Sequence, residues 1–386
     1  MSKKIKLIFL VFSLFLVVLT PSLVQAQGEL AVLKSSAVAI FPSQLSFSLS
    51  ARSSVNITDI RLCYSVDWDS FAEVINEGYV GFTPSTVVNV SWTLAMVKIG
   101  GLPPGATVKY WWRISDASGK RVETTPAQVQ YEDLRYSWRS LTEGKVTIYW
   151  YNGDDSFARE LMSAAQQALE RLAQSTGAYP EKVVRLYIYA SANDLKGAMV
   201  YPQEWTGGVE FTRYNIMAIG IAPSDINWGK TAIAHELTHL IIGQITLNPY
   251  NYLPPWLDEG LAMYNEGMLD PTFTFYLTRA IAKGGLISVQ SLSSPFSAST
   301  EEALLSYAES YSLIEFLIAS YGQGKMLELL NTFRQGSGYD DALKKVYGFD
   351  MGGLDSLWRD YVTKKYRSAA AVEEERVSPA LVSAGF

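Results

Sequence analysis

The sequence predicts two domains: an N-terminal β domain, then an α+β domain whose C-terminal half is mostly helical. The chain has 386 residues, which is more than a single ordinary hydrophobic core accommodates. Residues 27–135 alternate apolar and polar positions as β-strands do, whereas helical spacing dominates after residue 227. Apolar residues make up 48% of the chain and charged residues 18%, which indicates globular rather than disordered domains.

Residues 1–26 have the pattern of an export signal. The first six residues include three lysines, residues 7–19 are apolar, and Val24-Gln25-Ala26 offers the small residues that a signal peptidase prefers. We therefore expect cleavage after Ala26. The alternative is an uncleaved membrane anchor, although an apolar stretch of 13 residues is short for a membrane span. No later segment of the sequence is long and apolar enough to cross a bilayer.

The net charge and the cysteine content indicate which partners the protein can bind and in which cell compartment it acts. The formal net charge is −6, and loss of residues 1–26, which hold three lysines and no acidic residue, makes it −9. Such a surface repels nucleic acid, so we expect no nucleic-acid partner. Cys63 is the only cysteine and lies in an alternating run, where we expect a half-buried strand position. An exported protein without disulfides is typical of a bacterial or similar cell envelope, so we expect a secreted or extracytoplasmic protein.

Residues 27–135 predict a β-sandwich. Short alternating apolar runs recur, as in residues 45–49 and 108–114, and turn signals such as Pro103-Pro104-Gly105 separate them. Within residues 102–120 a Pro-Gly turn leads into an aromatic-rich strand, which resembles a corner of fibronectin type III domains. Short strands at this spacing favour a sandwich of fibronectin type III or immunoglobulin type.

Residues 146–366 predict an α+β domain, because strands come first and helices follow. The expected strands cover residues 146–150, 183–190 and 215–222. The expected helices cover residues 156–175, 229–243, 255–266, 301–321, 325–335, 339–347 and 354–366. A polar loop is expected at residues 291–300. Residues 367–386, which carry three consecutive glutamates among small residues, are expected to form a flexible tail.

The predicted chemistry rests on residues 235–239, which read His-Glu-Leu-Thr-His. In a helix, His235 and His239 lie one turn apart on the same face, so both imidazoles can bind one zinc ion. Glu236 would lie beside the metal rather than on it, where its carboxylate can take a proton from metal-bound water. Two core histidines placed by accident are the alternative, but the chain has only two histidines in all.

A catalytic zinc site needs a third protein ligand and one open position for water. No further histidine exists and Cys63 belongs to the other domain, so the third ligand should be a carboxylate. The best candidate is Glu259, on a helix that the prolines at 254 and 255 start. An acid that only meets the helix dipole is the alternative. Asp258 is the rival ligand, but it is one residue out of phase and better suited to solvent or to supporting a histidine.

The pairing of HELTH with the later run PWLDEGLAMY closely resembles the gluzincin metallopeptidases. It looks most like the peptidase MA-like domains and the related aminopeptidase-N family. The resemblance covers about residues 146–366. It implies a small mixed sheet with an active-site helix beneath it and a helical subdomain that brings the glutamate. It also implies that His235, His239 and Glu259 bind zinc and that Glu236 is the general base.

The same resemblance implies a tyrosine on a later helix that donates a hydrogen bond to the oxyanion of the reaction. Tyr307 is the best match to that position, and Tyr311 is a close competitor. One departure concerns residues 207–211. In aminopeptidases a glutamate of the matching strand grips the substrate amine; here Glu210 is present, but the methionine and asparagine that accompany it are missing.

These residues predict a secreted metallopeptidase with one zinc ion per chain and a peptide or protein as substrate. Zinc would activate water, and Glu236 would take the proton and pass it to the leaving nitrogen. A non-catalytic cell-envelope binding module with a structural zinc is the alternative from another class of protein. Hydrolysis of another bond, such as an ester, also fits the residues, and the choice between endopeptidase and aminopeptidase stays open.

Overall fold

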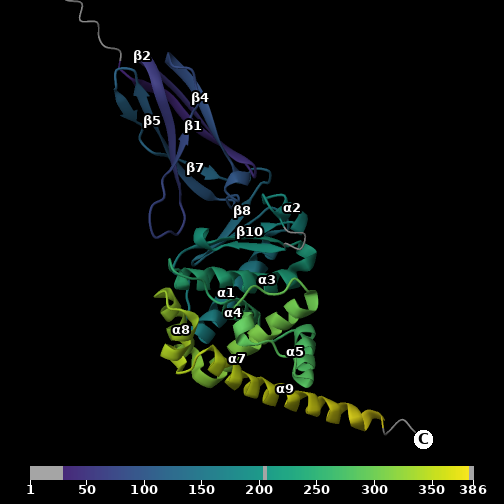
Figure 1. The fold of residues 1–386 in the computed structure, drawn as a ribbon. Coiled ribbons are helices and arrows are strands. Elements are labelled where there is room, and N and C mark those ends of the chain that lie inside the picture. The colour runs from purple at the N-terminus through teal and green to yellow at the C-terminus, as the bar shows by residue number, and fades with distance from the viewer. Residues whose placement is uncertain (1–28, 203–206, 382–386) are drawn as a thin grey trace, which may run out of the picture.

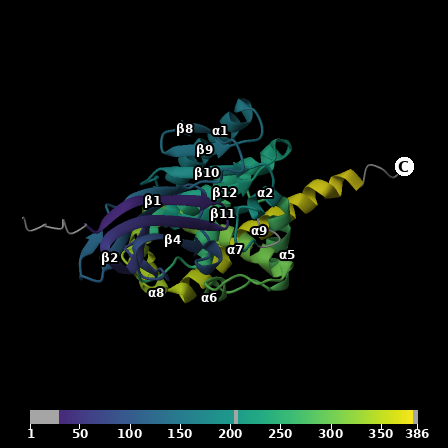
Figure 2. The same cartoon turned by 90° about the horizontal axis from the view of Figure 1, so that it is seen from above.

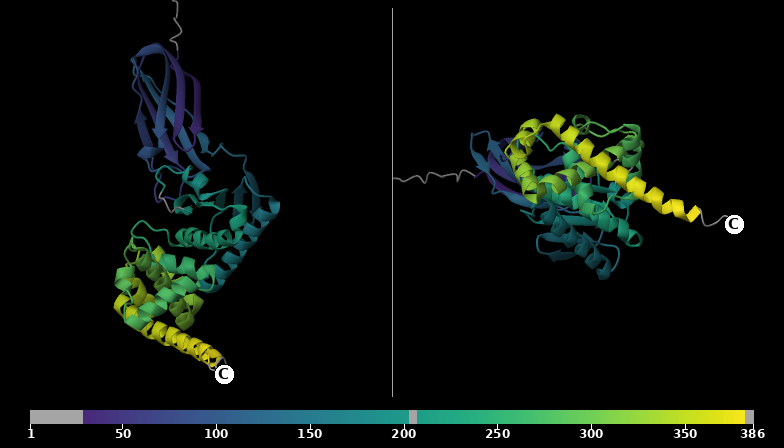
Figure 3. Two further views of the ribbon diagram at one scale, coloured as in Figure 1. Left: turned by 90° about the vertical axis from the view of Figure 1, so that its right-hand side faces the viewer. Right: turned by 90° about the horizontal axis from the view of Figure 1, so that it is seen from below.

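The computed structural model describes residues 29–202 and 207–381, with the backbone alone for 367–381 (Figure 1). The predicted export signal therefore lies outside the described residues. A β-rich N-terminal part is followed by a sheet and then by helices, which confirms the predicted order. The β domain and the last helix lie at opposite ends of the molecule (Figure 3). Within the described residues, no helix is long and apolar enough to span a membrane.

The N-terminal part contains, among the described residues, a hydrogen-bonded sheet of seven strands. They are β1 (Ala31–Ile40), β2 (Gln44–Val66), β3 (Asn76–Tyr79), β4 (Ser85–Ala95), β5 (Ala106–Asp116), β6 (Arg121–Glu123) and β7 (Ala127–Tyr131). The long strand β2 pairs directly with four of them, whereas β6 and β7 pair with β5. The first half of β2 pairs antiparallel with β1 and β4, and its second half pairs with β3 and β5.

The two halves of β2 contribute to one apolar core. Phe47 in the first half lies 5.0 Å, centroid to centroid, from Tyr110 on β5, the strand that pairs with the second half. Cys63 is fully buried rather than half-buried as expected. Its strand is paired on both sides at this position, with Trp111 of β5 and Glu77 of β3 as register partners. The β character of the domain is thus confirmed, whereas its fibronectin type III or immunoglobulin type stays a prediction.

The second part begins with a sheet of five strands, β8 (Arg139–Glu143), β9 (Val146–Trp150), β10 (Val184–Tyr189), β11 (Gly208–Phe211) and β12 (Ile216–Gly220). Their order is β11-β12-β10-β9-β8, which Figure 2 shows from above. Strands β9, β10 and β12 are parallel, and β8 and β11 are antiparallel to their neighbours. In the part of the chain that the structure describes, β11 pairs only with β12 and so forms an edge of the sheet.

Alternation along the strands gives the sheet two different faces. Leu186 and Ile188 of β10 join the main core with helices α1 (Asp155–Thr176) and α3 (Ile226–Thr246). Tyr187 and Tyr189 of the same strand point the other way, into an aromatic cluster beside α2 (Ala192–Lys196). Helices α1 and α3 lie between the sheet and the remaining helices (Figure 1). Helix α3 is therefore held on both sides.

The helical half consists of α4 (Pro255–Glu266), α5 (Pro271–Lys283), α6 (Val289–Leu292), α7 (Thr300–Arg334), α8 (Tyr339–Tyr347) and α9 (Met351–Leu381). The sequence predicted α4, α8 and residues 354–366 of α9, and it divided α7 near Gly322, where the backbone departs from helical angles. It missed α5, although Asp270 caps that helix by accepting a hydrogen bond from the Thr272 backbone. The predicted polar loop at 291–300 begins inside the short helix α6.

Two predicted helix ends are wrong, each for a physical reason. Helix α3 continues to Thr246 instead of ending at Gly243. A Cβ at residue 243 would lie 2.0 Å from Cγ2 of Thr212, so the glycine allows a close contact rather than a helix end. Helix α9 continues to Leu381, whereas a tail was expected from residue 367. The alanines and glutamates of that stretch have high helix propensity, which the prediction underweighted.

Candidate metal centre and active site

Helix α3 brings the two predicted histidines to one point. Its apolar residues, among them Ile233, Leu237 and Ile241, are fully buried in the core, which fixes the rotation of the helix about its axis. His235 and His239 follow one another by a single turn, and their Nε2 atoms lie 3.2 Å apart. Two ring nitrogens that approach the same point are suited to binding one cation.

Helix α4 brings Glu259 to the same point. Its Oε2 atom lies 3.4 Å from Nε2 of His235 and 3.6 Å from Nε2 of His239. The ligand atoms of the three residues all lie within 4.8 Å of one another, a property that no other trio of His, Cys, Asp or Glu shows among the described residues. Glu259 Oε2 is buried and accepts no hydrogen bond from a described residue. Such an atom beside two ring nitrogens fits a divalent cation.

The position of Glu259 is set by the start of its helix and by a close helix contact. Pro254 is extended, and Pro255 opens α4 as the sequence predicted. Gly260 then lies directly against α7, where a Cβ would be only 2.5 Å from the carbonyl oxygen of Ser310. The carboxylate of Glu259 is therefore placed by backbone packing and not by a flexible loop.

Each histidine is supported from behind by a carboxylate. Glu266 Oε1 lies 2.6 Å from Nδ1 of His235, and Asp258 Oδ1 lies 3.1 Å from Nδ1 of His239. Because an ionised carboxylate only accepts, each Nδ1–H donates, which leaves Nε2 available for a metal. Sequence analysis offered Asp258 for this position but did not find Glu266. The available signal was its spacing, since Glu266 follows Glu259 by seven residues on the same face of α4.

The charges of the carboxylates dominate this centre. Burial alone would lower the pKa of His235, but Glu259 and Glu266 outweigh it and raise this pKa to about 9. Burial alone would raise the pKa of Glu259, but the two imidazoles outweigh it and lower this pKa to about 2. With its acids ionised and its histidines neutral, the centre would carry net negative charge, which a divalent cation balances.

Glu236 lies between the ligand cluster and strand β11. Its Oε1 would be 2.8 Å from a Cβ added to Gly208, so the strand approaches this carboxylate very closely. Burial raises the pKa of Glu236; the two imidazoles oppose this shift, and the charges of Glu210 and Glu259 add to it. A carboxylate beside the ligands, with its affinity for a proton increased, is suited to proton transfer.

Helix α7 carries both candidate tyrosines, and their surroundings differ. Burial raises the pKa of Tyr307 to about 12, with a further rise from the charge of Glu259 and an opposing effect of His239. The ring of Tyr311 lies 5.6 Å from that of Tyr264, and its pKa responds to burial and to Glu315 instead. The charges that act on Tyr307 are those of the candidate metal centre, so Tyr307 rather than Tyr311 stays the predicted tyrosine of the site.

A match to a known protein family identifies the superfamily of this chain. Residues 164–364, just over half of the chain, match the model of the peptidase MA superfamily. The chain belongs to the peptidase MA superfamily. The match covers α3, α4 and α7 and thus all the residues of the candidate centre. Membership supports a peptidase, and hence a peptide substrate, at this coarse level.

Several solved structures are similar to this member of the peptidase MA superfamily at low identity. One is an M1 zinc metallopeptidase from Deinococcus radiodurans, with 14% identity, 84% of this chain and 90% of that chain covered, and a TM-score of 0.33. Another is an aminopeptidase N family protein from Idiomarina loihiensis, with 11% identity, coverage of 82% and 73%, and a TM-score of 0.38. OgpA from Akkermansia muciniphila matches at 14% identity over 29% of this chain and only 31% of its own, with a TM-score of 0.21. Among curated proteins no match is found.

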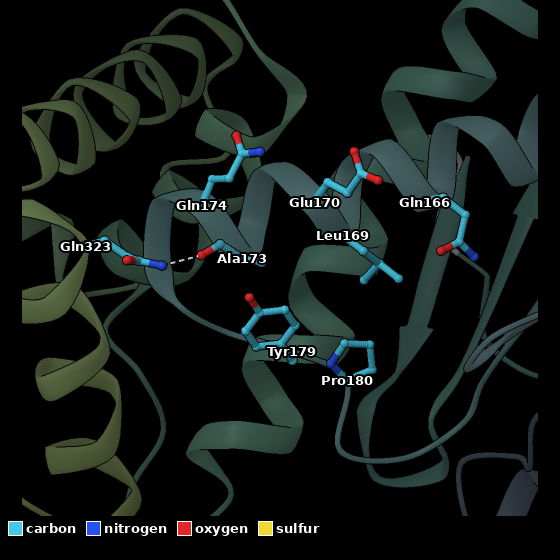
Figure 4. Close-up of a pocket in the computed structure, with 8 residues that line it drawn as sticks. All are labelled: Gln166, Leu169, Glu170, Ala173, Gln174, Tyr179, Pro180 and Gln323. Carbon is cyan, nitrogen blue, oxygen red and sulfur yellow. Dashed lines mark hydrogen bonds between the residues drawn. The ribbon is translucent and has the colours of Figure 1, made fainter.

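Of two pockets formed by described residues, the second reaches the centre and the first does not. The first, of about 630 Å³, lies on α1 and contains Glu170 as its single acidic residue and no histidine (Figure 4). The second, of about 530 Å³, includes His239, Asp258 and Glu210 in its wall. Glu210 thus lies near the candidate metal centre on the edge strand β11, as the resemblance suggested, although its role stays a prediction.

Proposed function

We propose that this protein is a zinc-dependent peptidase in which His235, His239 and Glu259 hold one zinc ion. The observation that carries the proposal is the approach of their three ligand atoms, with a carboxylate behind each imidazole. Two nitrogen ligands and one carboxylate are typical of a catalytic zinc site, which keeps a position open for water. A structural site would instead close the fourth position with another protein ligand.

The residues around the proposed zinc site have separate tasks in peptide hydrolysis. Zinc, when bound, would supply Lewis acidity that makes water acidic and polarises the substrate carbonyl. The Glu236 carboxylate takes a proton from the attacking water and passes it to the leaving nitrogen. The Tyr307 hydroxyl donates a hydrogen bond to the oxygen on which negative charge develops.

The edge strand β11 offers the means to position the substrate. One side of β11 pairs with β12. Gly208 of β11 lies against the proposed base Glu236. An extended peptide could add to the other side through main-chain hydrogen bonds. This would lay the scissile bond across the metal centre, independent of most side chains of the peptide.

The test compares three forms of the purified protein: wild type, Glu236→Gln and, as a matched control, Glu170→Gln, which changes an exposed acid on α1. Metal analysis should find about one zinc per chain in all three. Wild type and Glu170→Gln should hydrolyse members of a library of peptides and intact proteins. The Glu236→Gln protein should lose hydrolysis by several hundredfold or more. Equal hydrolysis by Glu236→Gln and wild type would refute the proposed base.

We further propose that the mature protein acts outside the cytoplasm. The support is the signal-like pattern of residues 1–26. Mass spectrometry of the protein from the extracytoplasmic fraction should give an N-terminus at Gln27. We also infer a fibronectin type III or immunoglobulin type for residues 27–135, supported by the seven strands around one core.

A further inference from the structure

A loop of the β domain is attached beside the candidate metal centre. It covers residues 67–75, between β2 and β3. Within it, Asp69 donates its backbone N–H to the carbonyl of Arg213 over 2.7 Å and accepts from Arg213 Nε over 2.9 Å at its own carbonyl. The Asp69 carboxylate accepts from Asn215 Nδ2 over 2.9 Å and pairs with Lys182. These contacts fix the loop on the turn η2 (Thr212–Tyr214) that links β11 to β12.

The same attachment extends through aromatic contacts and into α3. The guanidinium of Arg213 lies 4.3 Å from the centroid of the Trp68 ring, and this ring lies 5.6 Å from that of Tyr214. Asn215 also accepts a hydrogen bond from Gln244 of α3 over 2.7 Å. The loop therefore has a defined position relative to the helix that carries the histidines.

Phe71 of this loop forms part of the second pocket, opposite a loop of the other domain. The facing wall comes from residues 247–253, between α3 and α4. The exposed fractions are 54% for Phe71, 79% for Tyr250 and 91% for Tyr252. Large aromatic surfaces that are exposed to water around one pocket indicate a binding surface.

The pocket is continuous with the centre, because His239, Asp258 and Glu210 belong to its wall. Its volume of about 530 Å³ falls in the range of roughly 300–1,000 Å³ that is typical of ligand pockets. A peptide lying along β11 would pass its entrance. A side chain of such a peptide, at a position next to the scissile bond, could therefore enter the pocket and contact the aromatic rings.

We propose that this pocket is a substrate subsite for a bulky aromatic side chain, and that Phe71 makes the β domain part of the selection of substrate. This inference rests on the proposed peptidase function and deepens it. Aromatic residues bury large areas in ring-to-ring contacts, and the rings of Phe71, Tyr250 and Tyr252 supply partners for such contacts. The loop attachment through Asp69 keeps Phe71 in place.

The experiment measures kcat/KM of wild type and Phe71→Ala with peptide pairs that differ at one position near the cleaved bond, phenylalanine against alanine. For the position that enters the pocket, wild type should prefer phenylalanine, and Phe71→Ala should lose about tenfold in kcat/KM for that peptide only. The control is Phe275→Ala, an equally exposed phenylalanine on α5 with 58% exposure. Thermal unfolding of all three proteins verifies that they are folded. Loss on both peptides alike, or on neither, would overturn the subsite.

Binding to the zinc-loaded Glu236→Gln protein, measured by tryptophan fluorescence, separates this inference from the proposed function. If the Phe71→Ala change weakens binding of the phenylalanine peptide in that background while wild type cleaves nothing, the subsite stands and the peptidase function fails. If wild type cleaves peptides with no preference that depends on Phe71, the function stands and the subsite fails. Absence of both binding and cleavage refutes both.

Discussion

Replacing Glu266 by glutamine should weaken zinc binding more than the matching change behind the other histidine. The Glu266 carboxylate lies 2.6 Å from Nδ1 of His235 with 21% of its side chain exposed. Asp258 lies 3.1 Å from Nδ1 of His239 with 40% exposed. Short hydrogen bonds to an ionised group are the stronger ones, and exposed ion pairs are weakened by solvent.

Loss of a carboxylate behind a metal-binding histidine costs about 10- to 100-fold in metal affinity. We therefore expect Glu266→Gln to weaken zinc binding by about 100-fold, or about 2.7 kcal/mol. Asp258→Asn should weaken it by about tenfold, or about 1.4 kcal/mol. Both substitutions keep the shape of the side chain and remove its charge.

Competition with a chromophoric zinc chelator at neutral pH gives the three dissociation constants, for wild type and the two variants. Glu170→Gln on the exposed side of α1 is again the control and should bind zinc as wild type does. Circular dichroism confirms that each variant retains its helices. A larger loss in Asp258→Asn than in Glu266→Gln would refute the argument from distance and exposure.

Three further predictions follow from the helices around the centre. Tyr307→Phe should lower kcat for peptide hydrolysis far more than it changes KM, whereas Tyr311→Phe should change kcat little. A larger loss of kcat in Tyr311→Phe than in Tyr307→Phe would assign the oxyanion contact to Tyr311. Gly260→Ala should destabilise the protein by about 1–3 kcal/mol in urea unfolding, because the new Cβ would lie 2.5 Å from the Ser310 carbonyl oxygen. Glu309 is fully buried, and burial raises its pKa from 4.5 to about 8. Between these values the unfolded chain releases a proton that the folded chain keeps, so stability falls by up to about 1.4 kcal/mol per pH unit as pH rises. Glu309→Gln should remove that fall. Urea unfolding of both proteins at pH 5 and pH 8 measures it, and an equal loss of stability in wild type and Glu309→Gln would refute the reasoning.

The clustering of His235, His239 and Glu259 could be predicted because it follows from local geometry. His235 and His239 are neighbours on any helix, and the prolines before Glu259 set the phase of the second helix. The order of strands and helices could be predicted for the same reason, from periodicity. These features depend on residues close together in the sequence.

Features that depend on contacts between distant segments could not be predicted. A helix end was predicted at Gly243 because glycine often ends helices, and the sequence does not show its close contact with Thr212. Glu266 has the right spacing from Glu259, but only the fold shows that His235 lies within reach of it. Phe71 belongs to the β domain, and no local pattern places it in a pocket beside His239.

Asn215 connects three parts of the chain that are far apart in sequence. It donates to Asp69 of the β domain and accepts from Gln244 of the histidine-bearing helix, with a left-handed φ of 56° at the end of η2. A shortened chain starting at residue 136 would leave this amide with one partner fewer and strip the cover from Tyr214. We expect such a fragment to melt at a lower temperature than the intact protein, which calorimetry would reveal. The β domain thus contributes to the stability of the part of the chain that carries the histidines.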